Sequence, residues 1–337
     1  SSNAGADPCR LSVYTQNTWG VPIAPMLRER CQALADSFAG LNADVIVMQE
    51  VSRFSEYNVL REGGRKAGLN HCVHFGEGVG FPLWPNTNFV GALMVISRYP
   101  IVDVQFQVYS MKGKPMKVWH ADYYADKGIG LVRVLTPAGL VDVYSTHMHA
   151  DYTDDRTSQR NGETDEYHGL RISQAIEAAQ FVAHTRRGDL SVFAGDFNFN
   201  PAKLEYSVLT GLARLSDCWK CTHPEGEGED DSQFTFGHRD NSWTEYGDAF
   251  PQRLDMILFH CNNSATNSAT NSAKSSAEIS GGGVWQLRST RVIKSEMGEK
   301  ESTSTSVGGA WPRKHVSDHF GVQSDFLFTP APPHTSS

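Results

Sequence analysis

Residues 45–50 read Val-Ile-Val-Met-Gln-Glu, and this stretch decides the class of the fold. Its first four residues form an unbroken apolar run, which is typical of a strand buried on both faces. Residues 11–16 predict an earlier strand, and residues 26–41 carry apolar side chains at helical spacing, with Gly40 and Asn42 favouring the end of that helix. A strand, a helix and a buried strand in succession indicate an α/β protein.

Outward from this unit, strand patterns outnumber helical ones. We expect a long helix over residues 170–184, with an inward face made of Ile172, Ala175, Ile176, Ala179 and Phe181. The expected strands are residues 91–97, 102–108, 129–135, 141–147, 190–194, 254–260, 285–291 and 321–328. This pattern favours two packed sheets with helices outside them, in a single domain over residues 9–328.

Composition excludes several classes of protein. The 337 residues carry a formal net charge of -8, from 30 Lys and Arg against 38 Asp and Glu. This balance argues against a general nucleic-acid binder, which needs Lys and Arg to neutralise phosphates. No apolar run reaches the roughly 18 residues that a membrane-spanning helix needs. The six cysteines are too sparse for a disulfide framework, and Cys218-x-x-Cys221 lacks the second ligand pair of a structural zinc site.

Low-complexity segments interrupt the chain. Residues 1–8 include Ser-Ser-Asn-Ala, which we interpret as an appended tag, so a natural signal or anchor could be missing. Residues near 262–282 and 298–310 are rich in small polar side chains with little to bury, and we expect them to be mobile insertions. Residues 329–337 predict a disordered tail.

Polar side chains stand at the ends of the expected strands. Asn17 and Glu50 follow the first two strands. Asp255 lies inside the apolar run 254–259, and the others, each beside one end of a later strand, are His147, Asp196, Asn198, Asp318 and His319. Singly, such an Asp is more often a turn former or helix cap, and such a His is more often structural. Together they form an oxygen-rich cluster on a rigid scaffold, which suits Mg²⁺ or Mn²⁺ better than zinc.

In their order along the chain, these residues match the pattern of a known family. The matching segments are Gln16-Asn17, Gln49-Glu50, Ser97-Arg98-Tyr99-Pro100, Thr146-His147, Gly195-Asp196-Phe197-Asn198, Leu254-Asp255 and Ser317-Asp318-His319. This set resembles the endonuclease/exonuclease/phosphatase superfamily over residues 11 to 328. The resemblance implies a deoxyribonuclease I-like fold, a four-layer α/β sandwich of two mixed β-sheets flanked by helices.

Within that superfamily, the chain resembles the neutral sphingomyelinases. The resemblance rests on residues 17–22 (Asn-Thr-Trp-Gly-Val-Pro), on residues 146–152, and on Arg-x₂-Gln-x₅-Gln-Phe over residues 171–181. In addition, Asp122-x₄-Lys127-Gly128 resembles the Asp/Lys pair that eukaryotic members place on a mobile loop over the active site. The family implies a single catalytic domain that uses Mg²⁺ to hydrolyse sphingomyelin to ceramide and phosphocholine.

The resemblance also implies roles for the residues that handle the metal and water. Glu50, with Asn17 close by, would hold the metal, which would bind a phosphate oxygen. Asp196, or Asp255 paired with His319, would activate the attacking water. A carboxylate partner such as Asp255 orients an imidazole and favours its charged form.

Further roles concern the phosphoryl group. Asn198 and His147 would donate hydrogen bonds to its oxygens, and Asp318 would orient groups around the metal. Lys127 would alternate between the substrate phosphate and Asp122. The competing interpretation of that pair is an exposed surface ion pair with no effect on catalysis.

The implied partner is sphingomyelin or a related choline phospholipid at a membrane surface, with an anionic lipid as a candidate activator and no nucleic acid. The implied enzyme is a monomer that is either peripheral to a membrane or secreted. Residues 76–89 place Phe81, Leu83 and Trp84 on a loop that either touches a bilayer or folds back onto the core.

Other functions on the same fold stay open. A nuclease or abasic-site endonuclease would use the same core, and another choline-phospholipid phospholipase C would share the headgroup. An inositol polyphosphate 5-phosphatase would carry a Trp-Cys-Asp-Arg type of sequence where residues 251–255 read Pro-Gln-Arg-Leu-Asp. A non-catalytic binding module would be expected to lack one of Glu50, Asp196, Asn198 and His319, and all are present.

Overall fold

The computed structural model describes residues 9–21, 23–75, 92–117, 122–152, 165–224, 231–244, 250–262, 283–298 and 314–331. The predicted tag, the predicted bilayer-contact loop and most of the predicted insertions and tail fall outside the described residues. The single-domain boundaries therefore stay a prediction. Among the described helices, none is long and apolar enough to cross a membrane.

The first sheet has six strands in the order β11-β12-β1-β2-β4-β3. Their bounds are β1 Cys9–Asn17, β2 Val45–Gln49, β3 His71–Phe75, β4 Leu93–Ser97, β11 Val284–Ile293 and β12 Gly321–Thr329. Only β1 and β2 pair in parallel; the other neighbours are antiparallel. As a result the carboxyl ends of β1 and β2 lie at the same edge of this mixed sheet.

The second sheet also has six strands, in the order β5-β6-β7-β8-β10-β9. Their bounds are β5 Ile101–Val108, β6 Gly128–Thr136, β7 Gly139–His147, β8 Leu190–Asp196, β9 Ser216–Asp217 and β10 Asp255–Cys261. Here β7 and β8 form the parallel pair. This sheet repeats the plan of the first, with two parallel central strands whose carboxyl ends lie together.

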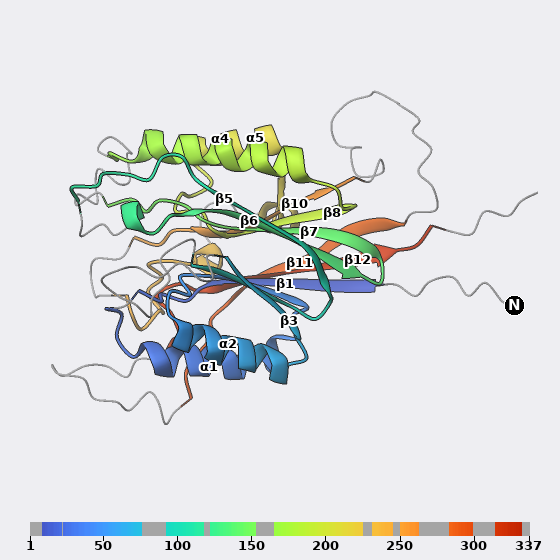
Figure 1. The fold of residues 1–337 in the computed structure, drawn as a ribbon, viewed down its shortest axis with the longest axis horizontal. Helices are drawn as coiled ribbons and strands as arrows, with labels where there is room; N and C mark the ends of the chain where they lie inside the picture. The colour runs from blue at the N-terminus through green and yellow to red at the C-terminus, as the bar shows by residue number, and fades with distance from the viewer. Residues whose placement is uncertain are drawn as a thin grey trace, which may run out of the picture.

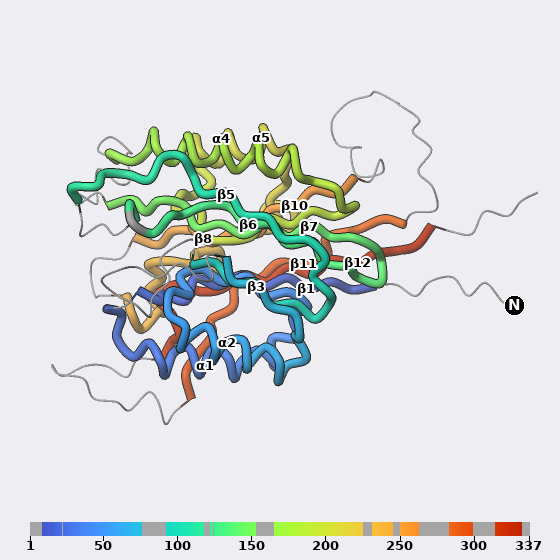
Figure 2. Tube along the Cα trace, viewed as in Figure 1, coloured from blue at the N-terminus to red at the C-terminus, as the bar shows by residue number. Residues whose placement is uncertain are grey.

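Helices cover the outer faces of both sheets, as Figure 1 shows. α1 (Leu27–Leu41) and α2 (Phe54–Lys66) lie below the first sheet, and α4 (His168–Thr185) and α5 (Leu204–Ala213) lie above the second. The short elements are α6 (Cys218–Thr222), η2 (Asp122–Tyr124) and η3 (Asp231–Gln233). The trace in Figure 2 follows the same succession of helix, sheet, sheet and helix. The predicted four-layer sandwich is confirmed.

An apolar core fills the space between the two sheets. Val13 and Val47 from the first sheet and Val143 and Val192 from the second are all fully buried in one cluster. Burying a side chain of this size stabilises the fold by roughly 1.5–3 kcal/mol. The close packing fixes one sheet against the other, so groups at their strand ends keep constant relative positions.

The predicted strands and the two predicted helices are all present, but the buried face of α4 differs from the prediction. Ala175 and Ala179 are fully buried, whereas Ile172, Ile176 and Phe181 are only partly buried. The residues that complete the buried face are Leu170, Arg171, Gln174, Ala178 and Val182. Small alanines let the helix approach the sheet closely, so the larger residues are displaced to the flanks.

Several elements were not predicted from the sequence, including α2, α5 and β3. In α2 the glycines at 63 and 64 obscure the helical pattern because glycine disfavours a helix interior. A Cβ at Gly63 would lie 2.5 Å from the Cβ of Ala35 on α1. The glycine is therefore there to let two helices touch, which only the tertiary structure reveals.

Candidate active site

The site forms where the ends of the central strands of both sheets meet. In the first sheet, Asn17 ends β1 and Glu50 directly follows β2. In the second, Asp196 ends β8 and lies opposite both His147 on β7 and Asp255 on β10. The parallel pairs place these residues at one edge of each sheet, and the packing of the sheets brings the two edges together.

Asp196 lies at the centre of this group. Its Oδ2 accepts a hydrogen bond from the Asn17 amide nitrogen at 2.9 Å. The same nitrogen donates to Glu50 Oε1, also at 2.9 Å, so Asn17 links carboxylates from different sheets. Nε2 of His147 and Nε2 of His319 lie 3.6 and 3.9 Å from the same Asp196 oxygen. Burial and the nearby Asp255 raise the pKa of Asp196 to about 6.

His319 and Asp255 form a buried pair. Nδ1 of His319 hydrogen-bonds to Oδ2 of Asp255 at 2.8 Å, which leaves Nε2 directed towards Asp196. Burial alone would lower the pKa of His319, but the charges of Asp255, Asp196 and Asp318 raise it well above its usual value. The imidazole is therefore held in its charged form, ready to donate from Nε2.

One carboxylate oxygen of Glu50 has no hydrogen-bond partner among the described residues, and a bound cation could contact it. This oxygen, Oε2, is buried. Burial and the charge of Asp318 raise the pKa of Glu50 to about 7, and burial also raises the pKa of Asp318. A hard divalent cation would satisfy this oxygen and offset the paired negative charges. The residues present thus fit the predicted ion.

Asn17 contributes differently from a simple ligand in this arrangement. Its amide nitrogen faces the two carboxylates, while its Oδ1 accepts a hydrogen bond from the backbone of Trp19 at 2.9 Å. It positions Glu50 directly, and ligation of the metal by Asn17 stays a prediction. One ligand atom each of Asp196, Asp255 and His319 also lie within 4.8 Å of one another. The hydrogen bond between His319 and Asp255 makes that trio better suited to proton transfer.

The predicted Asp122 and Lys127 pair lies inside the site. Lys127 Nζ is 2.9 Å from Asp122 Oδ1, and the two side chains are only 6% and 9% exposed. Lys127 also lies 3.0 Å from His147 Nε2 and donates to the Met148 carbonyl at 2.8 Å. Burial, followed by the Lys127 charge, lowers the pKa of His147 well below its usual value. The interpretation as an exposed surface pair is wrong.

The contact between Lys127 and His147 bears on the prediction that His147 and Asn198 donate hydrogen bonds to the phosphoryl group. Because Lys127 donates to His147 Nε2, that nitrogen accepts a hydrogen bond here. Asn198 has a left-handed backbone with φ 52°. Its amide nitrogen donates to the Met148 carbonyl at 2.8 Å. To donate a hydrogen bond to the substrate, His147 would have to give up its contact with Lys127, and Asn198 its contact with the Met148 carbonyl.

A pocket of about 340 Å³ opens over these groups. Its floor includes Glu50, Asp196 and His319, and its wall includes the buried Asp122 and Lys127. Phe236 packs on the ring of His319 at 4.8 Å between centroids. All the predicted site residues except Asn17 and Asp255 line the pocket, and those two lie directly behind it. The structure therefore gathers the whole predicted set in or directly behind one cavity.

Sequence reasoning missed Arg30, Tyr152, Arg171 and Lys203. The last three line the pocket, and Arg30 lies behind it, 1% exposed within α1. Tyr152 and Arg171 fall inside motifs that the sequence identified, so closer attention to those motifs could have found them. No sequence signal marks Arg30, because a basic residue on a helix is usually exposed.

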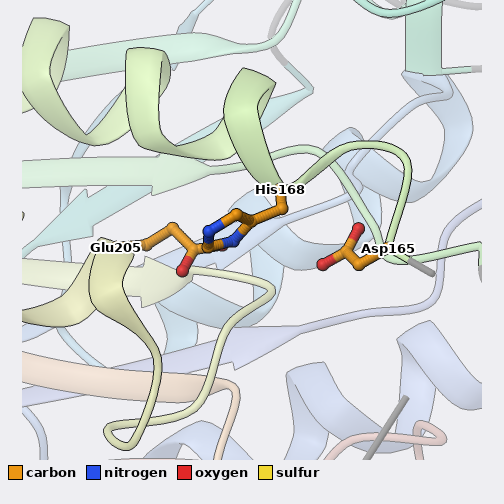
Figure 3. Close-up of side chains that lie close together, drawn as sticks. All are labelled: Asp165, His168 and Glu205. Atoms are coloured by element: carbon orange, nitrogen blue, oxygen red, sulfur yellow. The ribbon is translucent and has the colours of Figure 1, made fainter. Parts of the chain in front are cut away.

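A second carboxylate and histidine cluster lies beside the pocket, and Figure 3 shows its members. Asp165, His168 and Glu205 bring one ligand atom each within 4.8 Å. However, Arg171 forms ion pairs with both Asp165 and Glu205. Its guanidinium already supplies the positive charge that two buried carboxylates require, so this cluster is better described as an ion-pair network than as a metal site.

The chain has recognisable relatives. It is 33% identical over 210 residues to a protein of Drosophila melanogaster named putative neutral sphingomyelinase, covering 61% of this chain and 43% of that protein. It is 24% identical over 273 residues to a Schizosaccharomyces pombe protein named inositol phosphosphingolipids phospholipase C, covering 74% and 60%. The chain thus spans about half the length of the curated relatives it matches.

Solved structures share the fold. The structure titled SmcL matches with a TM-score of 0.65 and 19% identity, over 95% of this chain and 99% of that one. The structure of Danio rerio TDP2 with a single-strand DNA product matches with a TM-score of 0.62 and 15% identity, over 94% and 98%. A protein bound to a DNA product shares this fold, and the fold alone does not identify the substrate of this chain. The model of the Endonuclease/Exonuclease/phosphatase family matches residues 14–319, and the chain belongs to that family.

Proposed function

We propose that this chain carries a Mg²⁺-dependent phosphodiesterase of the phospholipase C type, which hydrolyses sphingomyelin to ceramide and phosphocholine. The observation that carries the proposal is the buried set of Asp196, the His319–Asp255 pair and the incompletely satisfied Glu50, gathered in one pocket. The name of the Drosophila relative supports sphingomyelin as the substrate. The Asp122–Lys127 pair at the pocket wall supports the same choice.

Asp196 is the best placed base for the attacking water. Its raised pKa of about 6 lets it accept a proton near neutral pH, whereas His319 is already protonated. As water attacks phosphorus, its proton passes to Asp196, and the bond to the ceramide oxygen breaks. The leaving oxygen takes up a proton from solvent to give the alcohol, and Asp196 later returns its proton to solvent.

Charge develops on the phosphoryl oxygens in the transition state, and two cationic groups line the pocket to meet it. His319, oriented by Asp255, presents Nε2–H, and Lys127 presents an ammonium held by Asp122. Glu50, positioned by Asn17, would hold the cation, with Asp318 beside it. When bound, Mg²⁺ supplies Lewis-acid stabilisation of the phosphate.

The enzyme would meet its substrate at a membrane surface, since sphingomyelin resides there. We infer a monomer that associates peripherally with the bilayer or is secreted. A second candidate is hydrolysis of inositol phosphosphingolipids, which the name of the S. pombe relative favours.

An assay panel with Mg²⁺ or excess chelator tests the proposal. The substrates are sphingomyelin, lyso-phosphatidylcholine, phosphatidylinositol bisphosphate and abasic DNA. We expect phosphocholine release from sphingomyelin, abolished by the chelator. Cleavage of abasic DNA alone would instead assign a nuclease.

His319→Ala provides the test of the catalytic group. A preorganised donor to the charge that develops on the phosphoryl oxygens contributes roughly 10² to 10³ in rate, so turnover should fall about that far. His184→Ala is the matched control, because His184 is exposed on α4. Near-normal turnover of His319→Ala at saturating substrate would contradict the assignment.

A further inference from the structure

Two turns beside the pocket carry exposed apolar side chains. Residues 21–24 read Val-Pro-Ile-Ala (the Ile23 turn) and residues 114–117 read Lys-Pro-Met-Lys (the Met116 turn), and a proline in second place favours a tight turn. In each, the backbone NH of the last residue donates to the carbonyl of the first, at 2.9 and 3.1 Å. Ile23 and Met116 are 91% and 83% exposed, more than any other large apolar residue that the structure describes. Neither side chain is buried by its own chain, so both are available to a partner.

The Ile23 turn borders the pocket on the side of the first sheet. It follows β1, and its first residue, Val21, lines the pocket together with Trp19. Arg30 fixes this segment from behind, since its guanidinium donates to the carbonyls of Trp19 and Pro25, both at 2.9 Å. The segment is therefore held on either side of the turn while Ile23 points into solvent.

The Met116 turn borders the pocket on the side of the second sheet. Gly113 precedes it with φ 100°, and a Cβ there would lie 2.6 Å from Nε2 of His149, so only glycine allows this approach. Nδ1 of His149 in turn lies 3.5 Å from Oδ2 of Asp122, which lines the pocket. The segments that carry the two turns lie at the same end of the sandwich in Figure 1, in dark blue and in teal.

Leu204 adds a third apolar position at the mouth of the pocket. It is the first residue of α5, it is 55% exposed, and it follows Lys203, which lines the pocket. Leu212 near the other end of α5 is 57% exposed, but it lies about 12 Å further along the helix axis. The two leucines therefore match in chemistry and exposure and differ in their distance from the mouth.

The charge around the Met116 turn is positive in sum. Lys114 and Lys117, the first and last residues of the turn, both pair with Glu166. Their hydrogen bonds lower the pKa of Glu166 to about 2, so it is ionised at neutral pH. Two ammonium groups share one carboxylate, and one positive charge remains. This local excess contrasts with the net charge of -8 of the whole chain and favours an anionic surface as the partner.

The arrangement fits a lipid bilayer better than a protein. A stable protein interface buries a continuous patch of about 800 Å² on each partner, whereas these apolar side chains stand on separate segments around a polar pocket. A bilayer deforms around separate apolar tips and accepts them at the boundary of its acyl chains. Lysine side chains beside such tips reach the headgroups with their ammonium groups.

We propose that Ile23, Met116 and Leu204 form a docking rim that inserts into the surface of a lipid bilayer, with the mouth of the pocket facing the headgroups. Lys114 and Lys117 then lie at the level of the headgroups. The rim is separate from residues 76–89, for which bilayer contact stays a prediction. The inference rests on the proposed function for the lipid that enters the pocket, whereas docking itself needs no turnover.

Co-sedimentation with vesicles of phosphatidylcholine and phosphatidylserine, in excess chelator, measures docking without turnover. Serine at a tip removes the apolar group, so Ile23→Ser and Met116→Ser should each raise the Kd for vesicles about tenfold. The double variant should lose about a hundredfold, because the turns are separate. Leu204→Ser should also weaken binding, and Leu212→Ser is its matched control and should bind like wild type. Binding of the double variant at the wild-type Kd would overturn the rim.

The presentation of the substrate separates docking from catalysis. With Mg²⁺, the tip variants should lose about tenfold in kcat/KM on sphingomyelin in vesicles and keep the wild-type value on a short-chain sphingomyelin dissolved as monomers. Their Tm should not change, since both side chains are exposed. Equal losses on the two substrates would contradict a docking role. If wild type hydrolyses neither substrate while the variants lose vesicle binding, the proposed function fails and the docking rim stands.

Discussion

Arg30 shows how one buried side chain fixes a site that it does not enter. From α1 its guanidinium donates to the carbonyls of Thr18, Trp19 and Val316, at 2.9 to 3.0 Å. The guanidinium also lies 4.8 Å from the Trp19 ring centroid. These contacts tie the loop that follows Asn17 to the loop that precedes Asp318. Arg30 is therefore a positioning residue for groups that surround the proposed metal site.

Arg30→Lys should weaken metal binding more than it weakens the fold. Lysine keeps the charge but has one nitrogen where arginine has several fixed donors, so the two loops lose part of their connection. We expect kcat to fall about tenfold or more and the Kd for Mg²⁺ to rise, as each lost bond to a charged donor is equivalent to roughly a tenfold change. Mg²⁺ titration calorimetry of the folded variant measures this without relying on turnover.

Arg133→Lys is the matched control for that variant. Arg133 is equally buried and is paired with Asp142 on the neighbouring strand, away from the catalytic strand ends. The Arg133→Lys variant should therefore have a lower Tm and an unchanged Kd for Mg²⁺. If both variants shift Kd alike, Arg30 has only a structural role.

His149 should make stability depend on pH. Burial is the main reason that its pKa falls from 6.5 to about 4, with Asp122 opposing the shift. Because the unfolded chain binds the proton more readily, this histidine stabilises the fold fully above pH 6.5, and the contribution is lost as pH falls towards 4. Between pH 7 and pH 5 the loss is about 2 kcal/mol.

Urea unfolding of wild type and His149→Asn at both pH values, in chelator, isolates this effect from the other titrating groups. The variant should be less stable at pH 7, since it loses the ring contact with Tyr167. From pH 7 to pH 5, the free energy of unfolding should fall by about 2 kcal/mol less in the variant than in wild type. Parallel pH dependences in the two proteins would exclude His149 as the source.

At the scale of elements, the segment from η2 to the start of β6 carries the most informative pair. Asp122 opens η2, and Lys127 directly precedes β6. Asp122 also accepts a hydrogen bond from the backbone NH of Ala150 at 2.8 Å, which links this segment to the loop after β7. The segment thus holds Lys127 at the pocket through contacts with a neighbouring loop.

Asp122→Ala and Lys127→Ala should each abolish most lipid hydrolysis. Lys127 acts on charge that develops in the transition state, so its loss should lower kcat more than it raises KM. The double variant should be far from additive, because Asp122 acts by placing Lys127. Turnover and Tm of the three variants measure the coupling.

Because the Asp122–Lys127 pair is buried, substituting either residue should also change the stability of the fold. Removing one partner leaves the other charge buried, so each single variant should lose some Tm and the double variant should recover part of it. Arg65→Ala, which breaks the exposed Arg65–Glu62 pair on α2, is the control and should change neither property. Normal turnover in both single variants would remove the pair from the mechanism.

At the scale of the whole molecule, the site lies across the contact between the two sheets. Asn17 ends β1 and Glu50 directly follows β2 in the first sheet, Asp196 and His147 belong to the second, and Asn17 bonds across the boundary. Close carboxylates in this position repel one another when charged. A cation bound there stabilises the assembled sandwich rather than one strand, since unfolded chains lack the site.

Mg²⁺ should therefore raise Tm in a concentration-dependent way. At about 100 times Kd, binding to the folded state alone stabilises it by roughly 2.7 kcal/mol. Glu50→Gln should remove most of this increment, while matching or exceeding the Tm of wild type in chelator, because it relieves repulsion with Asp318. Calorimetric scans over a Mg²⁺ series measure both effects. The exposed Glu62→Gln should keep the full increment.

The sequence by itself determined three kinds of feature. These are the first strand–helix–strand unit, most of the later strands, and the set of polar residues at the strand ends. Those features are local: hydrophobic periodicity and the residue at a strand terminus do not depend on distant partners. The order of Gln49-Glu50, Gly195-Asp196-Phe197-Asn198 and Ser317-Asp318-His319 along the chain was sufficient to indicate the family.

Only the tertiary structure decided which of these groups touch and which side chains support them. Asn17 and Asp196 are hydrogen-bonded although 179 residues separate them, and His319 and Asp255 are paired across 64. The burial of Arg30 and Arg171 is also decided by packing, since a charged residue on a helix is exposed unless distant chain covers it. Contacts, burial and proton affinity arise from neighbours that the fold brings together, so no local pattern in the sequence could specify them.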